Sequence, residues 1–297
     1  MNKLLFALPL LLLLPKKNAG TSKAGVLTIS TFLATSQKTE VKIYIPAHLI
    51  ASHQAASDLV VWLHGHNPNT QSLNEITERH NLEAQISKMS QRGRRRNSVW
   101  VAPYSTGKCE QFNEIFSSVE KTKSFLTEVL RVVATKGVSI RSNIPLVLAG
   151  QSGAGVPIRK FLTLTDNGTQ VYWPRVREVY LFDALYNAAE AFADFALQSN
   201  NRFWTVYGVS TEKGAQAIYQ MVAGKTSKGI FSDLNLGGSQ KPPIKKPAPK
   251  PAQYLAGQGL FECFGFTEQD KAKPIGFLSS PVEHKFTARN YLAAILS

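Results

Sequence analysis

The stretch that decides the fold is Ile144-Pro-Leu-Val-Leu-Ala-Gly-Gln-Ser152-Gly-Ala-Gly155, followed by Val156-Pro-Ile-Arg-Lys-Phe-Leu162. An apolar run with the character of a buried β-strand ends in a turn of small residues, and a helix-compatible segment follows. This order of strand, sharp turn and helix is that of a nucleophile elbow, which strains the backbone of its central residue and projects the side chain out of the sheet. Gly150 and Ala154 must be small there, because the strand and the helix pack closely around the serine. The sequence therefore predicts that Ser152 stands at the tip of a strained turn.

Strands and helices are predicted to alternate along the rest of the chain. Two strands, 26–32 and 40–45, come first, and the continuous apolar run 59–63 is typical of a strand buried on both faces. The further strands are predicted at 98–102, 176–182, 202–208 and 275–279, and the helices at 75–90, 114–134, 188–196, 213–222 and 287–296. This alternation predicts an α/β fold in which one domain has a mostly parallel sheet with helices on both faces.

Two segments are predicted to stand apart from this domain. Residues 1–19 contain a short basic start, an apolar run from Leu4 to Leu14 and then Lys16-Lys17, which is typical of a secretory signal and short for a membrane span. Residues 229–253 are rich in Pro, Gly and Lys, the composition of a flexible basic insertion. We therefore expect a signal peptide at 1–19, a folded domain at 20–297 and a secreted or periplasmic protein with no transmembrane domain after signal removal. An uncleaved anchor is the alternative for the first segment.

The charge balance favours anionic partners. The chain has 34 Lys and Arg against 20 Asp and Glu, a formal net charge of +14, and the charge is concentrated at Arg92–Arg96 and Lys241–Lys250. A basic surface attracts anionic lipid or an acidic cell-wall polymer, although a solvated basic face explains the same charge. No nucleic-acid-binding motif accompanies it, so no specific nucleic-acid partner is predicted.

The two cysteines, Cys109 and Cys263, leave two interpretations open. In an exported protein they can form one disulfide, and otherwise they are two buried thiols. Neither cysteine has a partner at metal-binding spacing.

With these elements in order, the chain resembles the α/β-hydrolase superfamily over roughly the whole region after the signal. The elbow departs from the commonest pattern, because Ala154 replaces its second glycine. The family order of serine, acid and histidine implies that Ser152 is the nucleophile. It also implies that His284, between the last predicted strand and the C-terminal helix, is the base that takes the serine proton.

Two carboxylates compete for the role of the triad acid. Asp183 ends the apolar strand 176–182, where a carboxylate is costly unless it accepts strong hydrogen bonds. Glu212 follows the next strand, which is the more usual family position, but it opens a helix with an exposed pattern. The sequence favours Asp183 and keeps Glu212 as the alternative acid. A helix cap is the structural alternative for Asp183.

The segment Leu63-His64-Gly65-His66-Asn67 follows the third strand, where the family carries its oxyanion loop. Gly65 lets the backbone turn, and the resemblance implies that the amides of His66 and Gly153 face the developing oxyanion. Two histidines flanking one glycine also suggest a metal site, but the sequence places no third ligand, so no metal and no cofactor are predicted.

The resemblance implies an exported serine hydrolase that cleaves a carboxylic ester, small or polymeric, through an acyl-enzyme intermediate with a Ser-His-Asp triad. Amide or peptide hydrolysis by the same triad is one alternative, since a fold does not fix its substrate. The other is a non-catalytic protein of this fold that binds an anionic surface through its basic insertion.

Overall fold

Strands and helices were located in a computed structural model of the chain. It describes residues 20–21, 25–35, 38–67, 71–91, 95–107, 109–186, 189–198, 201–207, 211–223, 254–256 and 259–265, and within these the side chains of a few residues, Glu212 and Cys263 among them, are not described.

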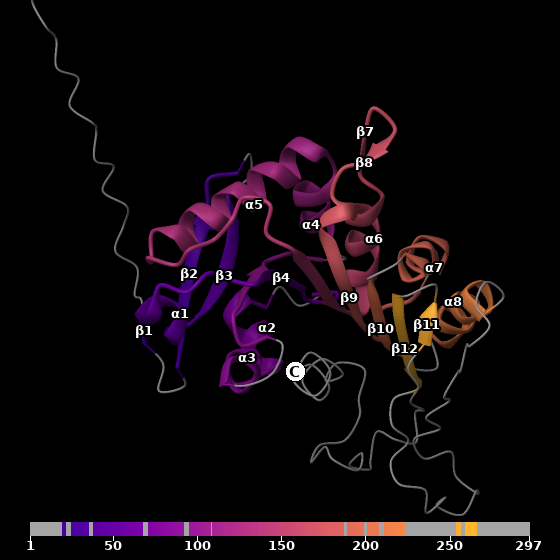
Figure 1. The fold of residues 1–297 in the computed structure, drawn as a ribbon, viewed down its shortest axis with the longest axis horizontal. Coiled ribbons are helices and arrows are strands. Elements are labelled where there is room, and N and C mark those ends of the chain that lie inside the picture. The colour runs from indigo at the N-terminus through magenta and orange to yellow at the C-terminus, as the bar shows by residue number, and fades with distance from the viewer. Residues whose placement is uncertain are drawn as a thin grey trace, which may run out of the picture.

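A ten-stranded sheet forms the centre of the described residues, in the order β1-β2-β3-β5-β4-β6-β9-β10-β12-β11 (Figure 1). The strands are β1 (Gly20–Thr21), β2 (Val26–Leu33), β3 (Thr39–Pro46), β4 (Asp58–Leu63), β5 (Ser98–Pro103), β6 (Leu146–Gln151), β9 (Val176–Phe182), β10 (Arg202–Tyr207), β11 (Tyr254–Ala256) and β12 (Gly259–Gly265). From β5 to β12 every neighbouring pair is parallel, whereas β2 and β3 join antiparallel. A separate hairpin pairs β7 (Thr165–Asp166) with β8 (Thr169–Gln170).

Helices cover both faces of the sheet, as the buried side chains of the parallel strands require (Figure 1). One face packs against α4 (Glu110–Phe116), α5 (Val119–Ala134), α6 (Gly155–Thr163), α7 (Ala189–Leu197) and α8 (Glu212–Ala223), and the short α1 (Ala47–Ser52) adds to its core. The other face packs against α2 (Leu73–Arg79) and α3 (Leu82–Gln91). The predicted architecture, a mostly parallel sheet with helices on both faces, is confirmed.

Two predicted helices are each interrupted. The prediction at 114–134 is wrong as one helix, because Ser118 adopts extended geometry and its side chain caps α5 by accepting from the amide of Lys121 at 3.2 Å. The prediction at 75–90 is also wrong as one helix, because Asn81 takes a positive φ of 49° between α2 and α3. The predicted strand 275–279 and helix 287–296 lie outside the described residues.

Strand β12 was not predicted, although its residues Leu260 to Gly265 pair in parallel with β10. The predicted signal at 1–19 and the whole insertion at 229–253 fall outside the described part of the chain. Within that part, no helix is long and apolar enough to cross a membrane.

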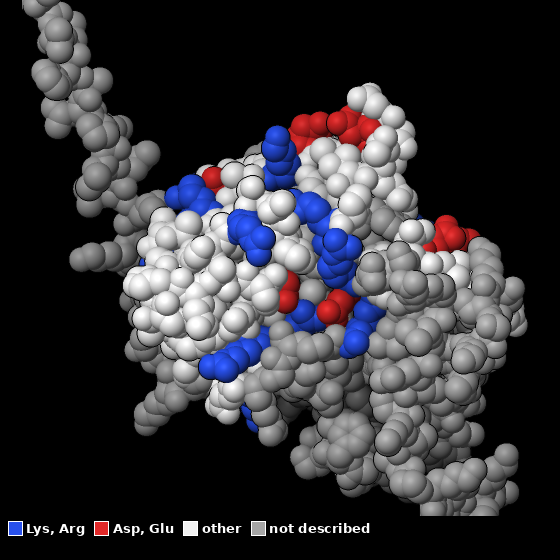
Figure 2. Space-filling model, in the orientation of Figure 1, with Lys and Arg blue, Asp and Glu red and all other residues white. Residues whose placement is uncertain are grey.

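One residue of the predicted basic surface is buried. Arg95, counted there as part of a basic surface cluster, is only 3 % exposed and forms ion pairs with Asp58 and Glu178. Figure 2 shows Lys and Arg side chains spread over one face of the molecule, with acidic side chains between them. On this face, the described basic side chains do not form one continuous patch.

Candidate active site

Ser152 occupies the tip of a tight turn between β6 and α6. Strand β6 is buried throughout, and a single 3-10 turn, Ser152–Ala154, joins it to the helix. Ser152 has a φ of +54°, a left-handed conformation that residues other than glycine rarely adopt. A Cβ added to Gly150 would lie 2.8 Å from the Cβ of Ala154, so both positions need small residues. This is the strained strand-turn-helix geometry that the sequence predicts.

The loop after β4 packs directly against this serine. A Cβ on Gly65 would lie 2.7 Å from the Cβ of Ser152 and 3.3 Å from its Oγ. Gly65 is therefore required for space beside the serine as well as for a turn. The position of a Cβ on Gly153 is 3.6 Å from the backbone nitrogen of His66, so the loop runs beside the residue that follows the serine.

The buried side chain of His64 holds the loop after β4 in place through hydrogen bonds to backbone groups. Its ring is fully buried, Nδ1 donates to the Gly65 carbonyl at 2.7 Å, and Nε2 accepts from the amide of Ser105 at 3.0 Å. Burial, with a smaller contribution from the charge of Arg79, lowers the pKa of His64 to about 4 against the opposing hydrogen bond to Gly65. Both ring nitrogens are engaged by backbone groups, which leaves neither for a metal ion shared with His66.

A second loop, between β5 and α4, holds the first one in place. The amide of Asn67 donates to the Gly107 carbonyl at 2.9 Å, and the Cys109 thiol donates to the His64 carbonyl at 3.8 Å. The thiol also lies 3.4 Å from the position of a Cβ on Gly153. Sequence reasoning missed Ser105 and Gly107, because their contacts are made by backbone atoms, and it considered Cys109 only as a disulfide partner or buried thiol.

The position of Cys109 argues against a bridge to Cys263. The Cys109 sulfur contacts the His64 carbonyl and Gly153, at the ends of β4 and β6. Cys263 pairs with Thr205 on β10, and the register runs on through Leu181 on β9 to Gly150 on β6. Three strand spacings of about 4.8 Å separate the Cα atoms of Cys263 and Gly150 by about 14 Å, whereas bridged Cα atoms lie within about 7 Å.

Asp183 stands at the end of the neighbouring strand. Phe182 pairs with Gln151, so Ser152 and Asp183 leave adjacent parallel strands at the same edge of the sheet. Asp183 is 2 % exposed, has a φ of +52°, and accepts a short hydrogen bond from the hydroxyl of Thr211. Thr211 is a buried residue just before α8, and no local sequence pattern pointed to it.

The structure describes only the backbone of the alternative acid, Glu212, and does not describe the proposed base, His284. Glu212 is the first residue of α8 and lies next to Thr211 along the chain. His284 lies outside the described residues. The structure therefore brings together Ser152, Gly153, His66 and Asp183 at one edge of the sheet.

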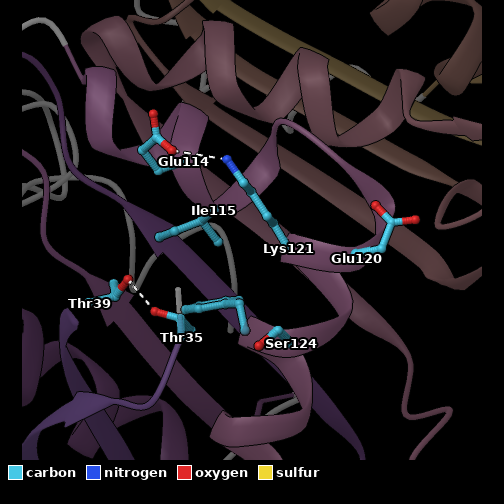
Figure 3. A pocket seen from close by; sticks show the side chains of 8 residues that line it. Thr35, Thr39, Glu114, Ile115, Glu120, Lys121 and Ser124 are labelled. Carbon is cyan, nitrogen blue, oxygen red and sulfur yellow. Dashed lines mark hydrogen bonds and ion pairs between the residues drawn. The ribbon is translucent and has the colours of Figure 1, made fainter. Parts of the chain in front are cut away.

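A separate pocket of about 200 Å³ lies between α4, α5 and the turn from β2 to β3 (Figure 3). Glu114 and Lys121 form an ion pair at 3.0 Å beside it, and the hydroxyls of Thr35 and Thr39 are 3.0 Å apart. Of the candidate catalytic residues that the structure describes, none lines this pocket.

Comparison with known proteins rests on structure alone, since no family model and no curated protein matches the chain. A feruloyl esterase module from Clostridium thermocellum, in complex with sinapinate, is similar with a TM-score of 0.54 and 11% identity, over 95% of this chain and 91% of that one. The chain has the α/β-hydrolase fold. Two weaker similarities were also found. One is to a ferulic acid esterase, with a TM-score of 0.47 and 14% identity over 67% of this chain and 85% of that one. The other is to an S-formylglutathione hydrolase from Agrobacterium tumefaciens, with a TM-score of 0.40 and 14% identity over 64% of this chain and 78% of that one. The similarity to the feruloyl esterase module confirms the fold predicted from the sequence.

Proposed function

We propose that the protein is an exported serine hydrolase that cleaves a carboxylic ester through an acyl-enzyme intermediate. The observation that carries the proposal is the left-handed Ser152 at the end of β6, with Gly65 so close that a methyl group would not fit between them. A strained serine with an adjacent backbone loop is the arrangement that acyl transfer requires. The esterase neighbours of the same fold support an ester as the substrate.

In the proposed mechanism, Ser152 Oγ attacks the ester carbonyl carbon while His284 takes the hydroxyl proton. The amides of His66 and Gly153 donate to the oxyanion of the tetrahedral intermediate. His284 then returns the proton to the departing alcohol, and water hydrolyses the acyl-enzyme by the same route. Asp183 orients His284 and stabilises its charged form.

Labelling with a fluorophosphonate probe tests the nucleophile. The wild type is expected to be labelled and Ser152→Ala is expected to lose the label, while Ser30→Ala, at an exposed position on β2, keeps it. Absence of labelling in the folded wild type would refute a serine hydrolase. Hydrolysis of a panel of ester and amide substrates, with hydroxycinnamate esters included, then separates the two reaction classes.

Substitution of the two carboxylates tests the acid. Asp183→Asn should lower kcat by roughly 10³ to 10⁴, the effect of losing the group that orients the base. Glu212→Gln should leave kcat within a few-fold of the wild type. If only Glu212→Gln impairs turnover, Glu212 is the acid.

Thr211 offers a further test of the same assignment. Thr211→Val removes the hydroxyl that donates to Asp183 and should lower kcat, whereas Thr211→Ser keeps the hydroxyl and should restore it. Equal activity of the two variants would separate this hydrogen bond from catalysis.

Export remains part of the proposal. Sequencing the N-terminus of protein from the periplasm or culture medium is expected to show that residues 1–19 have been removed. A full-length N-terminus on membrane-bound protein would favour an uncleaved anchor.

A further inference from the structure

Two exposed apolar side chains stand close to the candidate catalytic residues along the chain. Among the described residues, the large hydrophobic side chains that are substantially exposed are Phe32 (57%), Val156 (43%) and Tyr186 (39%). Val156 lies in the first turn of α6, four residues after Ser152. Tyr186 lies three residues after Asp183.

The segments that carry these two side chains are in direct contact. A Cβ on Gly155, the residue before Val156, would lie 2.0 Å from the carbonyl oxygen of Ala184. The backbone of α6 therefore packs against the segment that runs from Asp183 to Tyr186. Both side chains are held at the edge of the sheet where Ser152 lies.

The first turn of α8 also packs against the segment from Asp183 to Tyr186. A Cβ on Gly214 would lie 2.3 Å from the carbonyl oxygen of Leu185, and Ala184 and Leu185 are themselves buried. The segment that carries Tyr186 therefore packs against the first turns of both α6 and α8. A fixed backbone presents its side chain in a defined place, which is what a substrate contact needs.

Single exposed apolar residues are ordinary on protein surfaces, so exposure alone is not informative. What distinguishes Val156 and Tyr186 is that they come from two different elements, each next to a candidate catalytic residue, and that these elements touch. We propose that Val156 and Tyr186 form an apolar wall beside Ser152 that binds the hydrocarbon part of the ester. This inference rests on the proposed function and deepens it.

The wall defines a substrate class. Each methylene group buried against it should raise kcat/KM about fourfold. Esters that carry an aromatic ring or a chain of several carbons should therefore be better substrates than those whose acyl and alcohol groups are both small. The hydrocarbon can belong to the acyl group or to the alcohol, and the two are separated by experiment.

The test compares two series of esters. One series varies the acyl group at a constant alcohol, from p-nitrophenyl acetate to butyrate and hexanoate. The other varies the alcohol at constant acetate, from methyl to butyl and benzyl. For the double variant Val156→Ser/Tyr186→Ser, the preference for the larger substrate in kcat/KM should fall about tenfold in one series, which identifies the group that the wall contacts.

Two controls separate the wall from general effects. Phe32→Ser alters a more exposed residue on β2, four strands away from β6, and should leave both preferences unchanged. Tyr186→Phe keeps the ring and should retain the wild-type preference. Circular dichroism and thermal unfolding check that the double variant is folded at the assay temperature.

The outcomes distinguish the two proposals. If the double variant hydrolyses the acetate and keeps wild-type preferences in both series, the wall is refuted and the hydrolase stands. If the folded wild type is not labelled by the fluorophosphonate and hydrolyses no ester, the proposed function fails and the wall fails with it.

Discussion

The loop after β4 fits beside Ser152 only because Gly65 has no side chain. A Cβ there would lie 2.7 Å from the serine Cβ and 3.0 Å from the Gln151 carbonyl oxygen, closer than side-chain carbons approach. We expect Gly65→Ala to push the loop away and to lower kcat about 10² to 10³-fold, the effect of losing an oxyanion donor. Ester turnover measured beside circular dichroism checks this.

Gly137 provides the matched control for this prediction. Its φ is +79° and nothing lies within 4 Å of a Cβ there, so Gly137→Ala strains the backbone without a steric clash. This variant should lose about 1 kcal/mol of stability and keep its kcat. If Gly65→Ala keeps the wild-type kcat, the loop after β4 can shift without loss of activity and the prediction is wrong.

His64 makes the stability of the protein depend on pH. The folded protein keeps this ring neutral with a pKa of about 4, against about 6.5 in the unfolded chain, because burial disfavours its charge. Its contribution is full above pH 6.5 and is lost as the pH falls toward 4, where only the unfolded chain binds the proton. Over that window the free energy of unfolding should fall by about 3 kcal/mol from this group.

Denaturant unfolding at several pH values isolates this contribution. His64→Gln keeps an acceptor for the Ser105 amide and cannot be protonated. The difference in unfolding free energy between wild type and variant should shrink or reverse between pH 7 and pH 4. A difference that is constant with pH would show that His64 does not titrate in this range.

At the scale of elements, strands were easier to predict than the breaks between helices. Buried parallel strands are short apolar runs, so strands such as β4 and β9 appear in the sequence within a residue or two of their bounds. The break at Ser118 has no such mark, since apolar residues at helical spacing continue on both sides of it. Only the cap geometry separates α4 from α5.

That cap gives a prediction at the element scale. Ser118→Ala removes the oxygen that accepts from the Lys121 amide at 3.2 Å and should cost about 1 kcal/mol of stability. Ser117→Ala, at the exposed residue beside it, should change stability by a few tenths of a kcal/mol at most. Thermal unfolding of both variants is the measurement, and equal midpoints would mean that the cap does not stabilise α5.

At the scale of the whole molecule, the sequence predicted the sheet and the position of two candidate residues at its edge, but not the tertiary contacts. Ser152 and Asp183 were identifiable because each follows an apolar strand, and parallel strands bring their ends to one edge. The bond from Thr211 to Asp183 joins residues 28 positions apart. No local pattern records such a contact, nor the close approach of Gly65 to Ser152.

The buried Arg95 shows how distant segments are held together across the sheet. It lies before β5, and its guanidinium pairs with Asp58 at the start of β4, at 3.1 Å, and with Glu178 on β9, whose carboxylate also accepts from the Tyr180 hydroxyl. Burial alone would lower the pKa of Arg95, but the two carboxylates raise it above its ordinary value, so the side chain stays charged. The network spans the sheet from β5 to β9.

Removing Arg95 would leave two carboxylates without their buried cation. We expect Arg95→Met to lower the free energy of unfolding by about 3 to 5 kcal/mol, because an uncompensated buried charge is far more costly than a lost surface pair. Arg95→Lys keeps a charge but not the two-pronged geometry, so its loss should be intermediate. Arg131→Met breaks an ion pair with Glu128 in which Arg131 is 49% exposed, and it should cost less than about 1 kcal/mol. Equal losses from Arg95→Met and Arg131→Met in denaturant unfolding would show that the buried network does not hold these strands together.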